Sequence, residues 1–133
     1  AFPRGGDVMQ LEIGEKADVR IVRVKEAKLT YPNLSAFFAE VRQLVEGGTR
    51  KLLIDLSAVT YIDSASIGCL MDIYRLMQDR GGAVKLAGVQ PRVETMISMT
   101  GVHKLIDLHR EEGTALEAFG PTGGGKKKGK ADA

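Results

Sequence analysis

Apolar residues along the chain switch between two spacings, one typical of strands and one typical of helices. Residues 19–25, VRIVRVK, are β-branched and apolar on both faces, which is typical of a central strand. Over residues 34–45, apolar side chains recur every three or four positions, as on the buried face of a helix. The glycine pair at 47–48 ends this pattern, so we expect a helix that begins at Thr30 or Asn33 and stops there.

The alternation of the two spacings continues along the rest of the chain. The run 51–56, KLLIDL, is short and apolar and predicts a buried strand. After a loop at 60–63, a second helical stripe appears, formed by Ile67, Leu70, Met71, Tyr74 and Met77. The other expected elements are a first strand at 8–13, a strand at 83–87, a helix from Pro91 to Gly101, a strand at 105–108 and a helix at 111–119.

Helices that connect apolar strands form crossovers, which are almost always right-handed. We therefore expect an α/β fold, with a single mixed, largely parallel sheet of four to five strands and about four helices packed against it. The 133 residues suffice for one domain, expected at 8–119. We expect residues 1–7 to be disordered and residues 120–133 to form a flexible tail rich in Gly and Lys.

The positive charge of the chain is concentrated in this tail. The formal net charge is +2, but the tail alone holds four Lys and one Asp, so residues 1–119 are nearly neutral. No aromatic residues that could stack on bases are interleaved with Lys126, Lys127 and Lys128, so we expect no nucleic-acid partner. No apolar run approaches the ~20 residues of a membrane helix, so we expect no membrane association.

Cysteine and histidine are too rare for several kinds of site. One cysteine and two histidines exclude a disulfide framework and a zinc cluster, and we expect no metal and no cofactor. A single cysteine also suits a reducing compartment, so we expect a cytoplasmic protein.

One segment, residues 56–68, carries candidate chemistry. It lies between a predicted buried strand and the second predicted helix, where open α/β sheets place their sites. Asp63 and Ser64 fall at the start of that helix, where free N–H groups and the positive end of the dipole would receive a phosphate. The simpler interpretation is a helix cap, made by Asp63 or Ser64, with hydroxyls of Ser64 or Ser66 accepting free N–H groups. Composition and periodicity leave both interpretations open.

Three stretches, LLIDLSAVTYIDSASIG at 52–68, GGAVKLAGVQPRV at 81–93 and MTGVHKLI at 99–106, resemble the STAS domain family. The resemblance is to bacterial anti-sigma factor antagonists and covers residues 8–119. The first stretch matches an apolar strand, a short loop and the pattern D-S-[ST]-G-[LI]-G.

This resemblance implies that Ser64, directly after Asp63, accepts phosphate from a partner kinase. The phospho-loop residues are then Asp63, Ala65, Ser66 and Gly68. Ala65 and Ser66 depart from the family's Ser/Thr and Gly, whereas Gly68 matches. A second departure is Thr30, where many antagonists carry an Asp that contributes to partner recognition.

The implied partner is a serine kinase with a histidine-kinase-like ATPase fold that also acts as an anti-sigma factor. A metal-dependent Ser/Thr phosphatase would reset Ser64, and any adenine nucleotide would belong to the kinase. Unmodified chain would bind the partner, and phosphorylated chain would release it. We expect a monomer or weak dimer and no enzyme activity.

A docking surface is expected on the second helix, opposite its buried stripe. With the loop residues, the expected partner-binding set is Thr30, Ser64, Ala65, Cys69, Asp72 and Leu76, with Asp79 on the same face. Isolated exposed apolar residues also need no functional explanation. Cys69 has no basic neighbour in the sequence and is expected to be an unreactive thiol.

Other function classes fit the sequence less well. Ser64 lacks the G-x-S-x-G elbow of a serine hydrolase. Asp55 or Asp63 could suggest a phospho-aspartate receiver, but residues 25–32 supply only Glu26 where receivers need an acidic pair for Mg²⁺. The alternative that stays open is a STAS scaffold without phosphorylation, an interaction subunit of a signalling or lipid-transport assembly.

Overall fold

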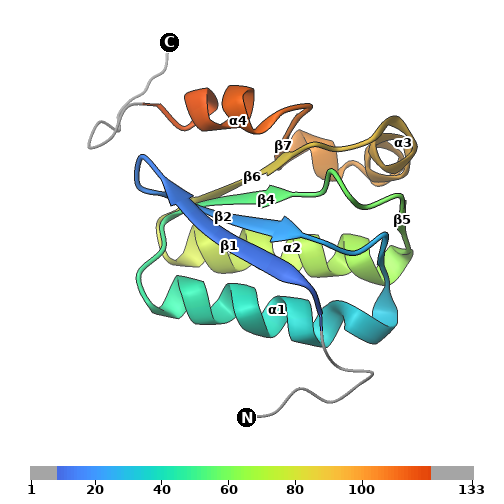
Figure 1. Ribbon diagram of the computed structural model, residues 1–133, viewed down its shortest axis with the longest axis horizontal. Coiled ribbons are helices and arrows are strands. Elements are labelled where there is room, and N and C mark those ends of the chain that lie inside the picture. Colours follow the sequence, from blue (N-terminus) through green and yellow to red (C-terminus); the bar gives the residue numbers. More distant parts are fainter. Residues whose placement is uncertain (1–8, 121–133) are drawn as a thin grey trace.

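The computed structural model describes residues 9–120, which form a five-stranded main sheet with helices on both faces and a small two-stranded sheet (Figure 1). The predicted disordered segment 1–7 and the tail from residue 121 lie outside the described residues. The elements are β1 (Leu11–Lys16), β2 (Val19–Val24), β3 (Lys28–Leu29), α1 (Tyr31–Glu46), β4 (Lys51–Asp55), β5 (Tyr61–Ile62), α2 (Ser64–Asp79), β6 (Ala83–Ala87), α3 (Pro91–Thr100), the 3₁₀ turn η2 (Val102–Lys104), β7 (Asp107–His109) and α4 (Glu112–Ala118).

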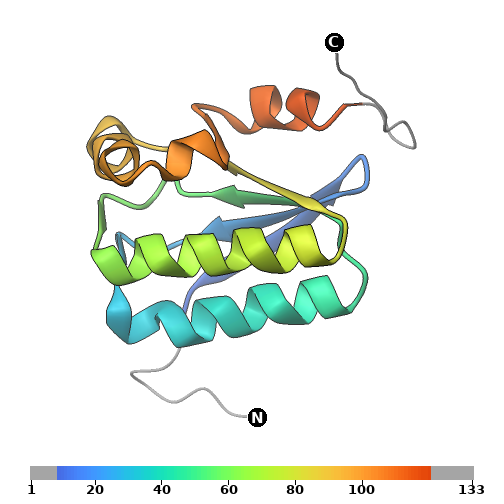
Figure 2. The same cartoon turned by 180° about the vertical axis from the view of Figure 1, so that it is seen from behind.

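The main sheet has the strand order β1-β2-β4-β6-β7. β1 pairs with β2 in antiparallel register, and the other pairs are parallel. Figures 1 and 2 show α1 and α2 side by side beneath one face of the sheet and α4 on the other. The predicted α/β class and the mixed, largely parallel sheet with four helices are confirmed. Among residues 9–120, no helix combines the length and the apolar content needed to cross a membrane.

The two faces of the sheet bury very different amounts of apolar surface. The larger core lies between the sheet and the helix pair and includes fully buried Phe37, Ile54 and Ile73. The smaller core, beneath α4, consists of Val19, Ile21, Leu53, Ala87 and Ala115. Because burial of apolar surface is the main driving force of folding, the α1–α2 face supplies most of the stability.

Most predicted elements are present, with shifts at their ends. The strand at 83–87 and the helix that starts at Pro91 are confirmed, and Gly101 ends that helix with φ of 85°. The first strand was expected at 8–13 but is Leu11–Lys16, and the last is Asp107–His109 rather than 105–108. The expected loop at 60–63 contains β5, which pairs with the unpredicted β3 in a small second sheet.

The short helix α4 is held to the sheet by an ion pair as well as by its small core. Arg23 donates from Nε to Glu112 Oε2 at 2.7 Å and from Nη2 to Oε1 at 3.0 Å. These bonds lower the pKa of Glu112 to about 2. Asp55 is 7% exposed, and burial followed by the neighbouring Glu112 carboxyl raises its pKa. Arg23 therefore pairs with Glu112 at the start of α4, and the buried Asp55 carboxyl at the end of β4 lies beside this pair.

We expect Glu112→Gln to lower the free energy of unfolding at pH 7 by about 1 kcal/mol, because a bidentate charged hydrogen bond is replaced by a weaker one. The folded-state pKa of Glu112 lies below its ordinary value of 4.5. Its contribution is therefore complete above pH 4.5 and is lost as the pH falls through about 2. Urea unfolding at several pH values measures this, with exposed Glu117→Gln as control. A difference from wild type that does not change with pH would contradict the assignment.

Candidate functional site

The N-termini of α1 and α2 meet at one end of the sheet, and the predicted phospho-loop lies there (Figure 1). The N-cap of α1 is Thr30, whose N–H donates to Asn33 Oδ1 at 3.0 Å. The N-cap of α2 is Asp63, and Ser64 is the first residue of the helix. Thr30 and Asp63, which are far apart in the sequence, thus begin neighbouring helices.

Asp63 bonds to both helix starts. Its Oδ1 accepts the backbone N–H of Ser66 at 2.9 Å, which caps α2. Its Oδ2 accepts the backbone N–H of Tyr31, the first residue of α1, at 3.0 Å. Partial burial acts to raise the pKa of Asp63, but the hydrogen bonds from Ser66 and Tyr31 outweigh it, so the pKa lies below its ordinary value. Asp63 is therefore an anion at neutral pH.

Ser66 is fully buried beneath this cap. Its Oγ accepts the N–H of Asp63 at 3.0 Å, which completes a capping box. The same Oγ lies within hydrogen-bond distance of two acceptors, the Leu29 carbonyl and Asp63 Oδ1. A hydroxyl has one hydrogen, so it serves one of them at a time. The simpler interpretation of Asp63 and Ser66 as a helix cap is confirmed for these two residues.

Ser64 differs from both neighbours in being exposed. Its hydroxyl makes no hydrogen bond to any residue in the range 9–120, so the cap does not use it. It lies in the first turn of α2, where backbone N–H groups lack helical partners. Ser64 is therefore the one hydroxyl of the phospho-loop that an incoming group can reach without disturbing the cap.

A groove of about 540 Å³ begins beside Ser64 and runs between α1 and α2. It is lined by Tyr31, Pro32, Leu34, Ser35, Phe38, Ala65, Gly68, Cys69 and Asp72. Its floor is apolar and belongs to the core, whereas Asp72 on its rim is exposed. Four of its nine lining residues thus come from α2, and three of these belong to the expected partner-binding set.

The expectation of an exposed face containing Cys69 is wrong. Cys69 is 9% exposed and packs in the main core, while Ala65 and Leu76 are half-buried against that core. The buried side of α2 also includes Ile73, whereas Met71 and Tyr74 of the predicted stripe are only half-buried. The stripe is therefore rotated towards α1, which covers Cys69. Asp72 and Asp79 are exposed as expected.

Two tyrosines beside Ser64 were not among the expected site residues. Tyr31 is 75% exposed and lines the groove, and Tyr61 in β5 is 46% exposed, three residues before Ser64. A tyrosine combines a large apolar ring with a polar hydroxyl, and exposed tyrosines are frequent anchors of interfaces. The sequence signal for Tyr31 was the Tyr31-Pro32 pair at a helix start. The exposure of the Tyr31 side chain could not be derived from residue spacing.

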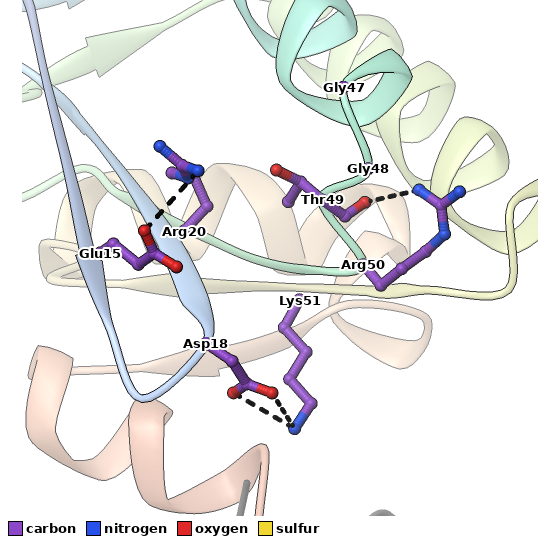
Figure 3. Close-up of a pocket in the computed structure, with 8 residues that line it drawn as sticks. All are labelled: Glu15, Asp18, Arg20, Gly47, Gly48, Thr49, Arg50 and Lys51. Carbon is purple, nitrogen blue, oxygen red and sulfur yellow. Dashed lines mark hydrogen bonds and ion pairs between the residues drawn. The ribbon is translucent and has the colours of Figure 1, made fainter. Parts of the chain in front are cut away.

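A second cavity, of about 360 Å³, lies near the C-terminus of α1 and is polar. Figure 3 shows that the side chains of Arg20, Arg50 and Lys51 point in three different directions. Arg50 donates to the carbonyls of Val45 and Thr49, and Lys51 pairs with Asp18 at 3.3 Å. These cations do not converge on one point, so the cavity offers no anion site. Within residues 9–120, no group of three or more His, Cys, Asp or Glu is placed to hold a metal ion.

Comparison with known proteins gives a family match over most of the chain. The family model described as the STAS domain matches residues 10–115. The anti-sigma-B factor antagonist of Staphylococcus aureus (strain NCTC 8325 / PS 47) is 28% identical over 88 residues, which is 66% of this chain and 77% of the relative.

Solved structures of similar fold agree with the family match. An anti-sigma factor antagonist from Mycobacterium paratuberculosis has a TM-score of 0.75 at 23% identity, covering 84% of this chain and 94% of that one. The Bacillus cell fate determinant SpoIIAA in its phosphorylated form has a TM-score of 0.63 at 15% identity, covering 84% of this chain and 98% of that one. At these identities, the two structures support the fold.

Burial lowers the reactivity of the Cys69 thiol, and this effect can be measured. Burial, with a smaller effect from Asp72, raises the pKa of its thiol to about 11. At pH 7.5 roughly one thiol in several thousand is then ionised, against roughly one in ten for an ordinary thiol. We expect a disulfide reagent to modify the native chain at least ~100-fold more slowly than the chain in concentrated urea. Equal rates in the two solvents would show that Cys69 is not covered by α1.

Proposed function

The chain belongs to the STAS domain family, and from that premise we propose that it is a partner-switching regulator of the anti-sigma factor antagonist type. The observation that carries the proposal is the exposed Ser64 hydroxyl, free of the cap network and next to the α1–α2 groove. The name of the Staphylococcus relative supports an anti-sigma factor as the partner.

The proposed partner is a serine kinase with a histidine-kinase-like ATPase fold that doubles as an anti-sigma factor. The kinase transfers the γ-phosphoryl group of ATP to Ser64 Oγ, ADP leaves, and the hydroxyl proton passes to a base on the kinase. A metal-dependent Ser/Thr phosphatase hydrolyses the ester and restores the hydroxyl. Because the donor is ATP, we place this cycle in the cytoplasm.

Phosphorylation acts on binding more than on folding. A phosphoserine carries −1.5 to −2 charges, which the N-terminus of α2 favours and the Asp63 carboxylate disfavours. At an exposed position each of these effects is about 1 kcal/mol or less, so they nearly cancel. In an interface that fits a neutral hydroxyl, the same charge must be desolvated without a partner, at a cost of several kcal/mol. The modified chain is therefore released.

The groove and its rim form the proposed docking surface. The exposed Tyr31 and Tyr61, which lie at the start of α1 and just before α2, serve as aromatic anchors, and Ala65 and Asp72 continue the surface along α2. Thr30 and Cys69 contribute indirectly: Thr30 caps α1, and Cys69 fills the floor between the helices. Leu76 lies about one helical turn beyond Asp72, the last α2 residue that lines the groove, and extends the surface.

A scaffold role without phosphorylation is the alternative, and one observation favours it. Asp63 already places a full negative charge at the N-terminus of α2 and repels a second anion there. In that case Ser64 contributes only a small polar contact to an interface of fixed affinity, and no kinase is required.

The first test is whether Ser64 carries phosphate in cells. We expect intact-mass measurement and peptide mapping to show one added phosphate, lost in Ser64→Ala. Ser35→Ala is the matched control, since Ser35 is an exposed serine across the groove. A chain that stays unmodified in growing and stressed cells alike would contradict the switch and favour the scaffold.

The second test is the effect of charge on docking. We expect Ser64→Asp to weaken binding to the kinase that modifies the chain by at least ~100-fold, which corresponds to a few kcal/mol of desolvation. Ser64→Ala should bind about as well as the unmodified chain. Calorimetric titration measures both, and an unchanged affinity of Ser64→Asp would rule out release by charge.

A further inference from the structure

The Asp63 carboxylate links two helices whose first residues are far apart in the chain. Tyr31 and Asp63 are separated by 32 positions, yet the N–H of the first donates to the carboxylate of the second at 3.0 Å. The other carboxylate oxygen caps α2 through the Ser66 N–H. The first turn of α1 therefore takes its position from the cap of α2.

Ser66 in turn controls how Asp63 is held. Its Oγ accepts the Asp63 N–H and contacts both Asp63 Oδ1 and the Leu29 carbonyl at the end of β3. With no exposed surface, Ser66 cannot touch a partner protein. It is also the position at which the sequence departs from the family's glycine, which would supply none of these hydroxyl contacts.

We propose that Ser66 is a positioning residue: through Asp63 it locks the first turn of α1 to the first turn of α2, and so fixes Tyr31 at the mouth of the α1–α2 groove beside Ser64. Tyr31 and Ser64 then form one recognition surface. This reading of the surface rests on the proposed docking function, whereas the lock itself is a property of the chain alone.

The lock matters for recognition because Tyr31 is 75% exposed, so its side chain packs little against the rest of the chain. Ordering an anchor residue on binding costs conformational entropy, and an anchor whose backbone is already held in place avoids part of that cost. The lock therefore favours partners that fit Tyr31 in one position, which makes Ser66 a determinant of specificity without contact.

Amide hydrogen exchange of the full chain tests the lock without any partner. In Ser66→Ala, we expect the Tyr31 N–H to exchange at least ~10-fold faster than in wild type. Asp63→Ser provides a second variant: one serine oxygen still caps α2 as well as Asp does, but it cannot also reach Tyr31. It should free the Tyr31 N–H while α2 keeps its protection.

Thr60→Ala is the matched control. It removes a similar hydroxyl-to-carbonyl bond, from Thr60 Oγ1 to the Ala27 carbonyl at 3.2 Å, without touching Asp63. Exchange at Tyr31 should stay within ~2-fold of wild type in this variant. If the exchange rate of the Tyr31 N–H is unchanged in both Ser66→Ala and Asp63→Ser, the lock is overturned. An equal acceleration of that exchange in Thr60→Ala would also overturn it.

A titration of the Asp63 carboxyl distinguishes a positioning role of Ser66 from a general loosening of the fold. In wild type the hydrogen bonds hold the pKa of Asp63 below its ordinary value. Ser66→Ala should raise that pKa, as followed by the carboxyl carbon signal in NMR, whereas Thr60→Ala should not. An Asp63 titration that is identical in wild type and Ser66→Ala would overturn the assignment of Ser66.

The amount of phosphate incorporated at Ser64 in cells then tests whether Ser66 and Tyr31 affect recognition by the kinase. Ser66→Ala and Tyr31→Ala should each reduce it several-fold, and the double variant should be no worse than Tyr31→Ala alone, because Ser66 acts through Tyr31. Independent losses would overturn the role of Ser66 in recognition. If wild type itself carries no phosphate, the proposed function fails, and the exchange and titration results still decide the lock.

Discussion

The site depends on one topological constraint: the two crossovers that lead from β2 to β4 and from β4 to β6 place their helices on the same face of the sheet. Parallel neighbouring strands and right-handed connections require this arrangement. The two helices therefore start at the same end, and one carboxylate can bond to both. Asp63 takes that role, and the groove, the exposed Ser64 and the exposed Tyr31 follow from the same adjacency.

The sequence predicted what local patterns encode. Strand β6 and the N-terminal Pro of α3 follow from short-range spacing, and Asp63 was recognised as a possible cap. Strands β3 and β5 have two residues each, too few for any periodicity. The burial of Cys69 depends on which side α1 covers, and the bond from Tyr31 to Asp63 spans 32 positions. Both are products of the assembled fold, so no local pattern could contain them.

The two faces of the sheet are held by different forces. Between the sheet and the helices α1 and α2, a continuous apolar core supplies most of the stabilisation. Helix α4 buries only Ala115 completely and relies on the charged contact between Arg23 and Glu112. The face that carries the site is therefore the one with the larger apolar core. A docking surface on it keeps its shape without a bound partner, which lowers the entropic cost of association.

The shared carboxylate of Asp63 also has an evolutionary consequence. Ser66 and Asp63 depend on one another through their side chains, whereas position 31 contributes a backbone N–H that every residue except proline supplies. A replacement at position 63 or 66 therefore changes the selective value of the residue at the other, whereas at position 31 only a proline would remove the donor. Among descendants of this chain, positions 63 and 66 should change together or not at all, position 31 should exclude proline, and the hydroxyl that departs from the family pattern would be inherited with its carboxylate partner.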